Sequence, residues 1–171
     1  MTVCHLALGS NIDAAANLQR AIACLKARDF HPGQFREFHP GGKLGLKLAR
    51  VRDVMHIGDS LPLVSAEADL TCAVIEMTRG RFGCVGVTDT NGCLIGIFTD
   101  GDLRRHFSPA NIERPITALM NDSPQSISPE TLIADVVHLF TERRIPSVFV
   151  CVEDTPVGIV HVHDLLQEGF I

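Results

Sequence analysis

Residues 51–107 read VRDVMHIGDSLPLVSAEADLTCAVIEMTRGRFGCVGVTDTNGCLIGIFTDGDLRRHF, and residues 116–171 read ITALMNDSPQSISPETLIADVVHLFTERRIPSVFVCVEDTPVGIVHVHDLLQEGFI. The two stretches are copies of one unit. Asp53-Val54-Met55 matches Ala118-Leu119-Met120, and Gly96-Ile97-Phe98-Thr99 matches Gly158-Ile159-Val160-His161. The two matches lie slightly closer together in the second copy, which indicates one shortened connection there.

Each copy predicts the same succession of helices and strands. Ser65 and Ser128 are expected as helix N-caps, with Pro129 at the first helical position. Apolar residues at three- and four-residue spacing then predict an amphipathic helix, shown most clearly by Leu132, Val136, Leu139 and Phe140. Strands are expected at 82–87 and 93–98 and again at 147–152 and 157–160, each pair joined by a tight turn, with closing helices at 100–106 and 162–167.

The repeat divides the chain into an extension and two modules. We expect an N-terminal extension at 1–48, a first module at 49–110 and a second at 111–171. A module of about 60 residues buries too little surface to be stable alone. The two modules should therefore pack sheet against sheet around one shared core, in an α+β fold.

The composition limits which binding partners and which cellular compartment we expect for this protein. The formal net charge is −5, so no overall positive field would attract nucleic acid or an anionic membrane. No apolar run approaches the roughly 18 residues of a membrane span, and the N-terminus lacks the basic region of a secretory signal. We expect a cytoplasmic protein that binds neither nucleic acid nor membrane. The six cysteines form no C-x-x-C pair, which favours small buried apolar residues over zinc ligands, and no metal is expected.

The order of elements, with a strand that leads into Gly96-Ile97-Phe98-Thr99-Asp100-Gly101-Asp102, resembles the CBS domain. The resemblance implies a tandem CBS pair, each member a small sheet with two helices, preceded by a helical extension. Residues 38–55, FHPGGKLGLKLARVRDVM, resemble the junction in bacterial arabinose-5-phosphate isomerase. In that family a sugar isomerase domain ends at His-Pro-Gly-Gly and a CBS pair follows. This resemblance covers roughly residues 25–171.

The isomerase resemblance implies a role for His39, which matches a histidine proposed to act in acid–base chemistry on the sugar phosphate. An aldose–ketose isomerase also needs a base and groups that hold the phosphate. The lysine and glutamates that supply these functions in the family have no counterpart in this chain. We therefore expect that the chain lacks the sugar isomerase domain and is not catalytic by itself. In that case His39 indicates the family resemblance only and is a surface residue in a Gly-rich turn.

Residues 1–25 have a different resemblance. MTVCHLALGSN is similar to the start of the folate-pathway pterin pyrophosphokinase, which opens with a strand that ends in Leu-Gly-Ser-Asn. The acidic pair that binds magnesium in that kinase is not found downstream. The alternative is a short strand-like stub before a helix at 14–28, and we predict no likeness between residues 1–25 and the isomerase family.

The CBS resemblance also implies a ligand site at Thr99 and Asp102. In nucleotide-binding CBS domains the Ser or Thr at this place contacts phosphate, and the Asp three residues later contacts both ribose hydroxyls. The alternative is that Thr99 only caps the following helix, with Asp102 completing a capping box. In the second copy His161 replaces the threonine while Asp164 remains, so at most one well-formed nucleotide site is expected, near Thr99. Residues 145–147 and 81–83 are secondary candidates for the base pocket.

Together these features predict a regulatory CBS pair of an arabinose-5-phosphate isomerase-like protein, which the family's pathway connects to Kdo and lipopolysaccharide biosynthesis. The expected ligand is AMP, ATP or a cytidine-sugar nucleotide, and no cofactor is expected. One alternative is a structural dimerisation module without ligand. Another is a stand-alone protein that binds adenine nucleotides. A homodimer or higher homo-oligomer is expected in each case.

Overall fold

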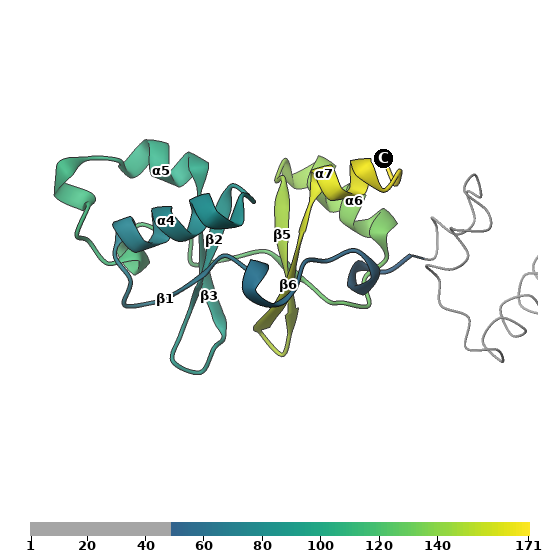
Figure 1. The fold of residues 1–171 in the computed structure, drawn as a ribbon, viewed down its shortest axis with the longest axis horizontal. Coiled ribbons are helices and arrows are strands. Elements are labelled where there is room, and N and C mark those ends of the chain that lie inside the picture. Colours follow the sequence, from purple (N-terminus) through teal and green to yellow (C-terminus); the bar gives the residue numbers. More distant parts are fainter. Residues whose placement is uncertain (1–48) are drawn as a thin grey trace, which may run out of the picture. The chain divides into compact units, whose positions relative to one another are not determined.

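The computed structural model describes residues 49–171. His39, the pyrophosphokinase-like segment and the rest of the predicted extension lie outside the described residues. Within 49–171 the chain forms two three-stranded sheets, each accompanied by two helices (Figure 1). The predicted α+β fold of two similar modules is therefore confirmed. None of the helices in this part of the chain is both long and apolar enough to cross a membrane.

The first half contains β1 (Leu63–Ser65), α4 (Leu70–Gly80), β2 (Cys84–Thr88), β3 (Leu94–Thr99) and α5 (Asp100–His106). Its sheet has the order β1-β2-β3, with β1 parallel to β2 and β3 antiparallel to β2. The 3-10 turns η1 (Val51–Asp53) and η2 (Gly58–Ser60) precede it.

The second half repeats this topology with β4 (Ser126–Ile127), α6 (Ile133–Arg143), β5 (Ser147–Val152), β6 (Thr155–His161) and α7 (Val162–Gln167). The sheet order is β4-β5-β6, again with one parallel and one antiparallel pairing. The turns η3 (Pro109–Asn111) and η4 (Ile116–Ala118) connect the two halves.

The predicted helix starts at Ser65 and Ser128 are wrong. Ser65 is the last residue of β1, and Ser128 directly follows β4, so each marks the end of a short parallel strand that the sequence did not predict. The N-cap of α4 is Asp69, whose Oδ1 accepts a hydrogen bond of 2.8 Å from the backbone N–H of Cys72. Pro129 accordingly lies in the turn before α6. The hairpin strands and the closing helices α5 and α7 agree with the prediction, with small shifts at some strand ends.

The leading segment of each repeat packs into the other half. Val51 is fully buried among core residues of the second half, such as Ile133 and Val136. In the first half Ile116 takes the corresponding place, beside Leu70. The two halves therefore exchange their leading segments, which we call the crossed segments, 51–56 and 116–121.

Backbone bridges fix the crossed segments on the outer strands. His56 pairs with Ile159 of β6 through N–H to C=O hydrogen bonds of 2.9 and 3.0 Å. Asn121 pairs with Ile97 of β3 through two such bonds of 2.9 Å. The same exchange is thus made twice, once in each direction.

Two glycines make room for these crossings. A Cβ atom at Gly158 would lie 2.6 Å from the Met55 sulfur and 3.1 Å from the carbonyl oxygen of His56. A Cβ atom at Gly96 would collide with the sulfur of Met120 in the same way. Gly96 therefore packs directly against Met120, and Gly158 packs directly against Met55. These are the residues from which the repeat is recognised, since Gly96 matches Gly158 and Met55 matches Met120.

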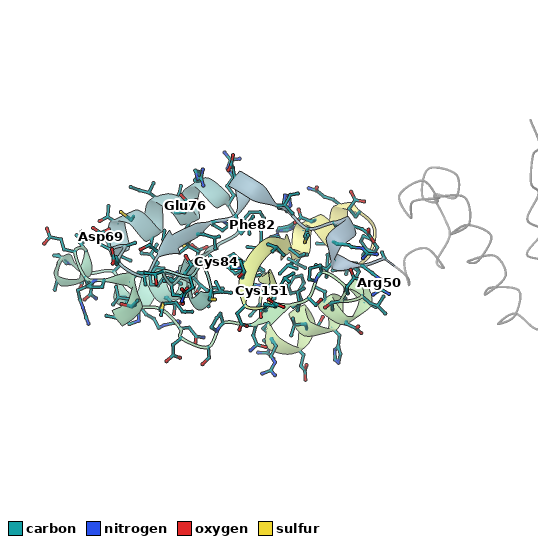
Figure 2. All side chains as sticks on the ribbon, turned by 90° about the horizontal axis from the view of Figure 1, so that it is seen from below. Arg50, Asp69, Glu76, Phe82, Cys84 and Cys151 are labelled. Atoms are coloured by element: carbon teal, nitrogen blue, oxygen red, sulfur yellow. The ribbon has the colours of Figure 1, made fainter. Side chains whose placement is uncertain are left out.

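The buried residues form three clusters, where the sequence predicted one shared core. One cluster lies in each half and includes the crossed segment from the other. The third joins the two halves and consists of Leu61, Phe82, Cys84, Phe149 and Ile159. Phe82, Cys84 and the partly buried Cys151 are labelled near the centre of Figure 2. Cys84 is buried as expected, whereas Cys72 is exposed on α4, which contradicts the prediction for that residue.

Candidate functional site

A cavity of about 410 Å³, the first cleft, lies where the two halves meet. The first half contributes the end of β3 and the start of α5, including Thr99 and Arg104. The second half contributes residues 144–147, which lead from α6 into β5, and part of the crossed segment around Asn121. Both predicted base-pocket segments touch this cavity, because Ile145, Pro146, Ser147 and Gly83 are among the lining residues.

Thr99 and Asp102 hold each other in a capping box at the start of α5. The Thr99 backbone N–H donates to Asp102 Oδ2 at 3.0 Å, and the Thr99 hydroxyl donates to the same oxygen at 2.6 Å. The Thr99 oxygen accepts in turn from the Asp102 backbone N–H at 3.3 Å. Arg105 forms an ion pair with Asp102 Oδ1. The helix-capping alternative is thus present in the structure, and the ligand role of both residues stays a prediction.

Two arginines, one aspartate (Asp100) and an apolar wall line the first cleft. Arg104 comes from α5, and Arg144 is the C-cap of α6 in a left-handed conformation, with φ of 54°. Neither guanidinium forms an ion pair with another described residue, so both are available to an anion. Ile97, Ile145 and Pro146 supply apolar surface beside them.

Cys84 and Ser147 are buried residues in the lining of the first cleft. The Ser147 hydroxyl donates a hydrogen bond of 2.6 Å to the carbonyl oxygen of Phe82, which ties the two halves together at the cleft. Burial raises the pKa of the Cys84 thiol to about 12. This cysteine is therefore neutral near pH 7 and contributes packing rather than nucleophilic chemistry.

A second cavity of about 410 Å³, the second cleft, has a different lining. Its residues come from the crossed segment, including Asp53 and His56, and from α7, including Asp164. His56 Nε2 lies 3.0 Å from Asp164 Oδ2. In contrast to the first cleft, the charged side chains here are mainly carboxylates.

His161, which replaces Thr99 in the second copy, caps α7 with its ring. Its Nδ1 accepts a hydrogen bond of 3.1 Å from the backbone N–H of His163, and the backbone N–H of His161 donates to Asp164 Oδ2 at 3.2 Å. Burial lowers the pKa of His161, and the neighbouring His163 lowers it further, although Asp164 acts in the opposite direction. An imidazole that accepts at Nδ1 therefore serves as the cap of α7.

Aromatic rings connect His161 to the crossed segment. The ring of Phe82 lies 5.1 Å from that of His56 and 6.3 Å from that of His161, and His161 stacks on His163 at 4.9 Å. Across residues 49–171 no group of three or more His, Cys, Asp or Glu side chains is arranged to hold a metal ion.

The structure brings the four predicted ligand residues together in two pairs, Thr99 with Asp102 and His161 with Asp164. Thr99 lines the first cleft and Asp164 the second, whereas Asp102 and His161 are engaged in helix caps and are not among the described residues that line either cavity. Sequence reasoning missed Arg104 and Arg144 as site residues. Their signal was weak, because arginines near the C-terminal ends of helices also suit the helix dipole.

Comparison with known proteins identifies the repeated unit. The CBS domain model matches residues 51–109 and 116–170. Arabinose 5-phosphate isomerase KdsD of Salmonella typhi is 39% identical over 175 residues, which cover 98% of this chain and 53% of that protein. The KdsD of Pseudomonas aeruginosa is 42% identical over 153 residues, which cover 87% of this chain and 47% of the isomerase. The chain spans about half the length of these relatives.

These matches confirm the resemblance to the isomerase family and correct one detail. The Salmonella alignment covers 98% of the chain, so it extends into residues 1–25, and the prediction that these residues have no likeness to the isomerase is wrong. The crystal structure of CBSX2 in complex with AMP has a TM-score of 0.60 at 21% identity, over 69% of this chain and 93% of that one, which shows a shared fold. From Val51 onward, the chain belongs to the CBS domain family as a tandem pair.

Proposed function

We propose that this CBS pair is a cytoplasmic regulatory module that binds a phosphorylated nucleotide in the first cleft. The observation that carries the proposal is the pair of arginines, Arg104 and Arg144, which line one cavity from opposite halves and have no carboxylate partner among the described residues. A guanidinium presents several N–H donors in a planar fork that matches phosphate oxygens.

The rest of the first cleft is consistent with a nucleotide. Its volume of about 410 Å³ lies within the range of small-molecule pockets, about 300–1,000 Å³. Ile97, Ile145 and Pro146 offer apolar surface on which a base could lie, while Gln125 and Asn121 offer polar edges. CBSX2, whose structure holds AMP, shares the fold and supports the choice of adenine nucleotides as first ligands to test.

The similarity to KdsD suggests what the module regulates. In this proposal ligand binding shifts the activity of an arabinose 5-phosphate isomerase, attached or separate, in the pathway to Kdo and lipopolysaccharide. Because the first cleft is built from both halves, a ligand there would fix their relative position. Such a change would reach the upstream chain through residues 49–56, which are anchored on the second half.

Thermal unfolding with AMP, ATP, CMP and a cytidine-sugar nucleotide at millimolar concentration tests the proposal. A ligand at one hundred times its Kd should stabilise the protein by about 2.7 kcal/mol. Arg104→Gln and Arg144→Gln should each reduce this stabilisation. The matched controls are Arg105→Gln, one residue along α5, and Arg81→Gln, the left-handed C-cap of α4 that corresponds to Arg144. The absence of stabilisation by all four nucleotides would refute the proposal.

A second candidate function is a dimerisation module, which two exposed apolar side chains favour. Ile75 on α4 is 63% exposed, and Phe107 at the end of α5 is 72% exposed. Burying such side chains in a second copy would be favourable. Sedimentation equilibrium would detect the dimer, and Ile75→Asp should weaken it, whereas Thr141→Asp at an exposed position of α6 in the second half is the control. A monomer at all concentrations would exclude this function.

A further inference from the structure

We propose that the start of α7 is a proton switch, in which a proton on the ring of His161 uncaps the helix and loosens the neighbouring wall of the first cleft. The switch lies in the second half of the molecule and is built from histidines that the proposed function does not use. Only its effect on ligand binding rests on the proposed function.

The cap of α7 requires that one particular ring nitrogen carries no proton. Nδ1 of His161 accepts a hydrogen bond of 3.1 Å from the backbone N–H of His163. A neutral imidazole has one nitrogen that accepts and one that donates, whereas both nitrogens of an imidazolium donate. A proton on Nδ1 therefore replaces the cap by two N–H groups that face each other. The corresponding cap of α5, the hydroxyl of Thr99, does not titrate between about pH 5 and 8.

The rings of His56, Phe82, His161 and His163 gather around this cap. His161 stacks on His163 at 4.9 Å, and Phe82 lies 6.3 Å from His161 and 5.1 Å from His56. The corresponding residues of the opposite repeat line the first cleft, and none of them is a histidine: Asn121, Ile145, Thr99 and Gly101. Groups that bind a proton near pH 6.5 are therefore concentrated at the start of α7 and absent from the equivalent described residues at the start of α5.

The charges around His161 set the pH at which the switch acts. Burial lowers the pKa of His161, and His163 and His56 lower it further, whereas Asp164 raises it. Asp164 Oδ2 also lies 3.0 Å from His56 Nε2, so two imidazoles share this carboxylate. The neutral, capping ring is therefore favoured in the folded protein. Its stabilising contribution is complete above the ordinary pKa of 6.5 and is lost as the pH falls through the lowered pKa. The other charged groups nearby lie in the second cleft and beside Phe82: Asp53, Glu168 and Arg81.

Two contacts lead from the start of α7 to the first cleft. The backbone N–H of Val162, the first residue of α7, donates to the carbonyl oxygen of Pro146 at 2.8 Å. The carbonyl oxygen of Phe82, whose ring lies beside that of His161, accepts a hydrogen bond of 2.6 Å from the hydroxyl of Ser147. Pro146 and Ser147 both line the first cleft. When the cap opens, the first turn of α7 frays and this wall loses an anchor.

NMR of the whole chain at pH 7.5 and pH 5.0 tests the proposal directly. Proton–nitrogen correlation spectra of the imidazole should show Nδ1 of His161 without a proton at pH 7.5 and with one at pH 5.0. Amide hydrogen exchange, corrected for the intrinsic effect of pH, should show protection at Val162 and His163 falling about tenfold between these two values. The amides of Asp100 and Asp102 at the start of α5 are the internal control and should keep their protection, because the hydroxyl cap there does not titrate.

The matched variant is His161→Thr, which gives α7 the residue that caps α5. Protection at Val162 and His163 should then be the same at both pH values. His163→Gln removes a neighbouring positive charge while keeping the backbone donor, so the loss of protection should move to higher pH, a shift that a merely structural role of His163 does not produce. If a variant does not fold at pH 7.5, the spectra of the native protein decide.

The outcomes separate the switch from the proposed function. A proton on Nδ1 at pH 7.5, or unchanged protection at Val162 and His163 down to pH 5.0, would overturn the switch. An equal loss of protection in His161→Thr would overturn it as well. If AMP or ATP binds, its affinity should fall about tenfold more between pH 7.5 and 5.0 in the native protein than in His161→Thr, and an equal fall in both would refute the link to the first cleft. If neither nucleotide binds, the proposed function fails, while the ring spectra and the exchange data still decide for or against the switch.

Discussion

Replacing Val51 by alanine should destabilise the second half of the molecule, although Val51 belongs to the first repeat by sequence. The side chain is fully buried in the cluster that contains Ile133 and Val136. Its backbone N–H also donates to the carbonyl oxygen of Thr131 at 3.0 Å, so the segment is held in place and cannot easily close over a void.

The magnitude follows from the atoms removed. Valine to alanine deletes two methyl groups, each worth about 0.8 kcal/mol when buried. The cavity that remains adds to this cost because its walls relax only partly. We expect the free energy of unfolding to fall by about 2–3 kcal/mol in total, and Tm to fall by about 4–12 °C for a chain of this size.

Urea unfolding gives the global value, and native-state hydrogen exchange shows where the loss occurs. Amides of α6 and β5 should lose protection in Val51→Ala, and amides of α4 and β2 in Ile116→Ala, because Ile116 is buried in the first half. Ile57→Ala is the control, since Ile57 is 61% exposed and should change stability by about 0.5 kcal/mol at most. Loss of protection in α4 and β2 alone after Val51→Ala would refute the crossed arrangement.

Three further predictions concern single groups. The lowered pKa of His161 means that the folded protein favours the neutral ring. The contribution of this residue to the free energy of unfolding is therefore complete above the ordinary pKa of 6.5 and is lost as the pH falls through the lowered pKa. The urea midpoint should therefore drop from pH 7.5 to 5.5 and drop less in His161→Asn, and an equal drop in both proteins would contradict this. Asp69→Ala should lower the free energy of unfolding by about 1 kcal/mol, because the backbone N–H of Cys72 loses its hydrogen-bond acceptor at the start of α4. An unchanged urea midpoint would contradict this. The thiol of Cys84, with its pKa raised to about 12, should resist iodoacetamide at pH 8 until urea is added, and rapid labelling of the native protein, mapped by mass spectrometry, would show that it is accessible.

The sequence predicted the elements that depend on local signals. The strand at 147–152 and the helices at 100–106 and 162–167 were located correctly, because their apolar runs and flanking turn residues are contiguous. The short parallel strands β1 and β4 were missed, since two or three residues are too few to show an alternating pattern. Ser65 and Ser128 then looked like helix caps, which are favoured by the same residue type.

The crossed segments and the character of the site could not be read from local pattern. A buried Val51 or Ile116 has the same appearance in a sequence whichever half it packs against. Thr99 and Asp102 have a spacing that serves both a capping box and a ligand site, and only the hydrogen bonds show which groups are already engaged. Arg144 reaches the first cleft only because the second half packs against the first.

The exchange of Val51 and Ile116 bears on how such a protein could have arisen. A single repeat would lack the apolar segment that covers its outer strand, and its own leading segment would be exposed. It could therefore bury its core only as a dimer in which two identical molecules exchange these segments. Joining two repeats on one chain turns that encounter into an internal one, at a far higher effective concentration. Cutting the chain between Phe107 and Ile116 should for the same reason leave two fragments that stay entwined.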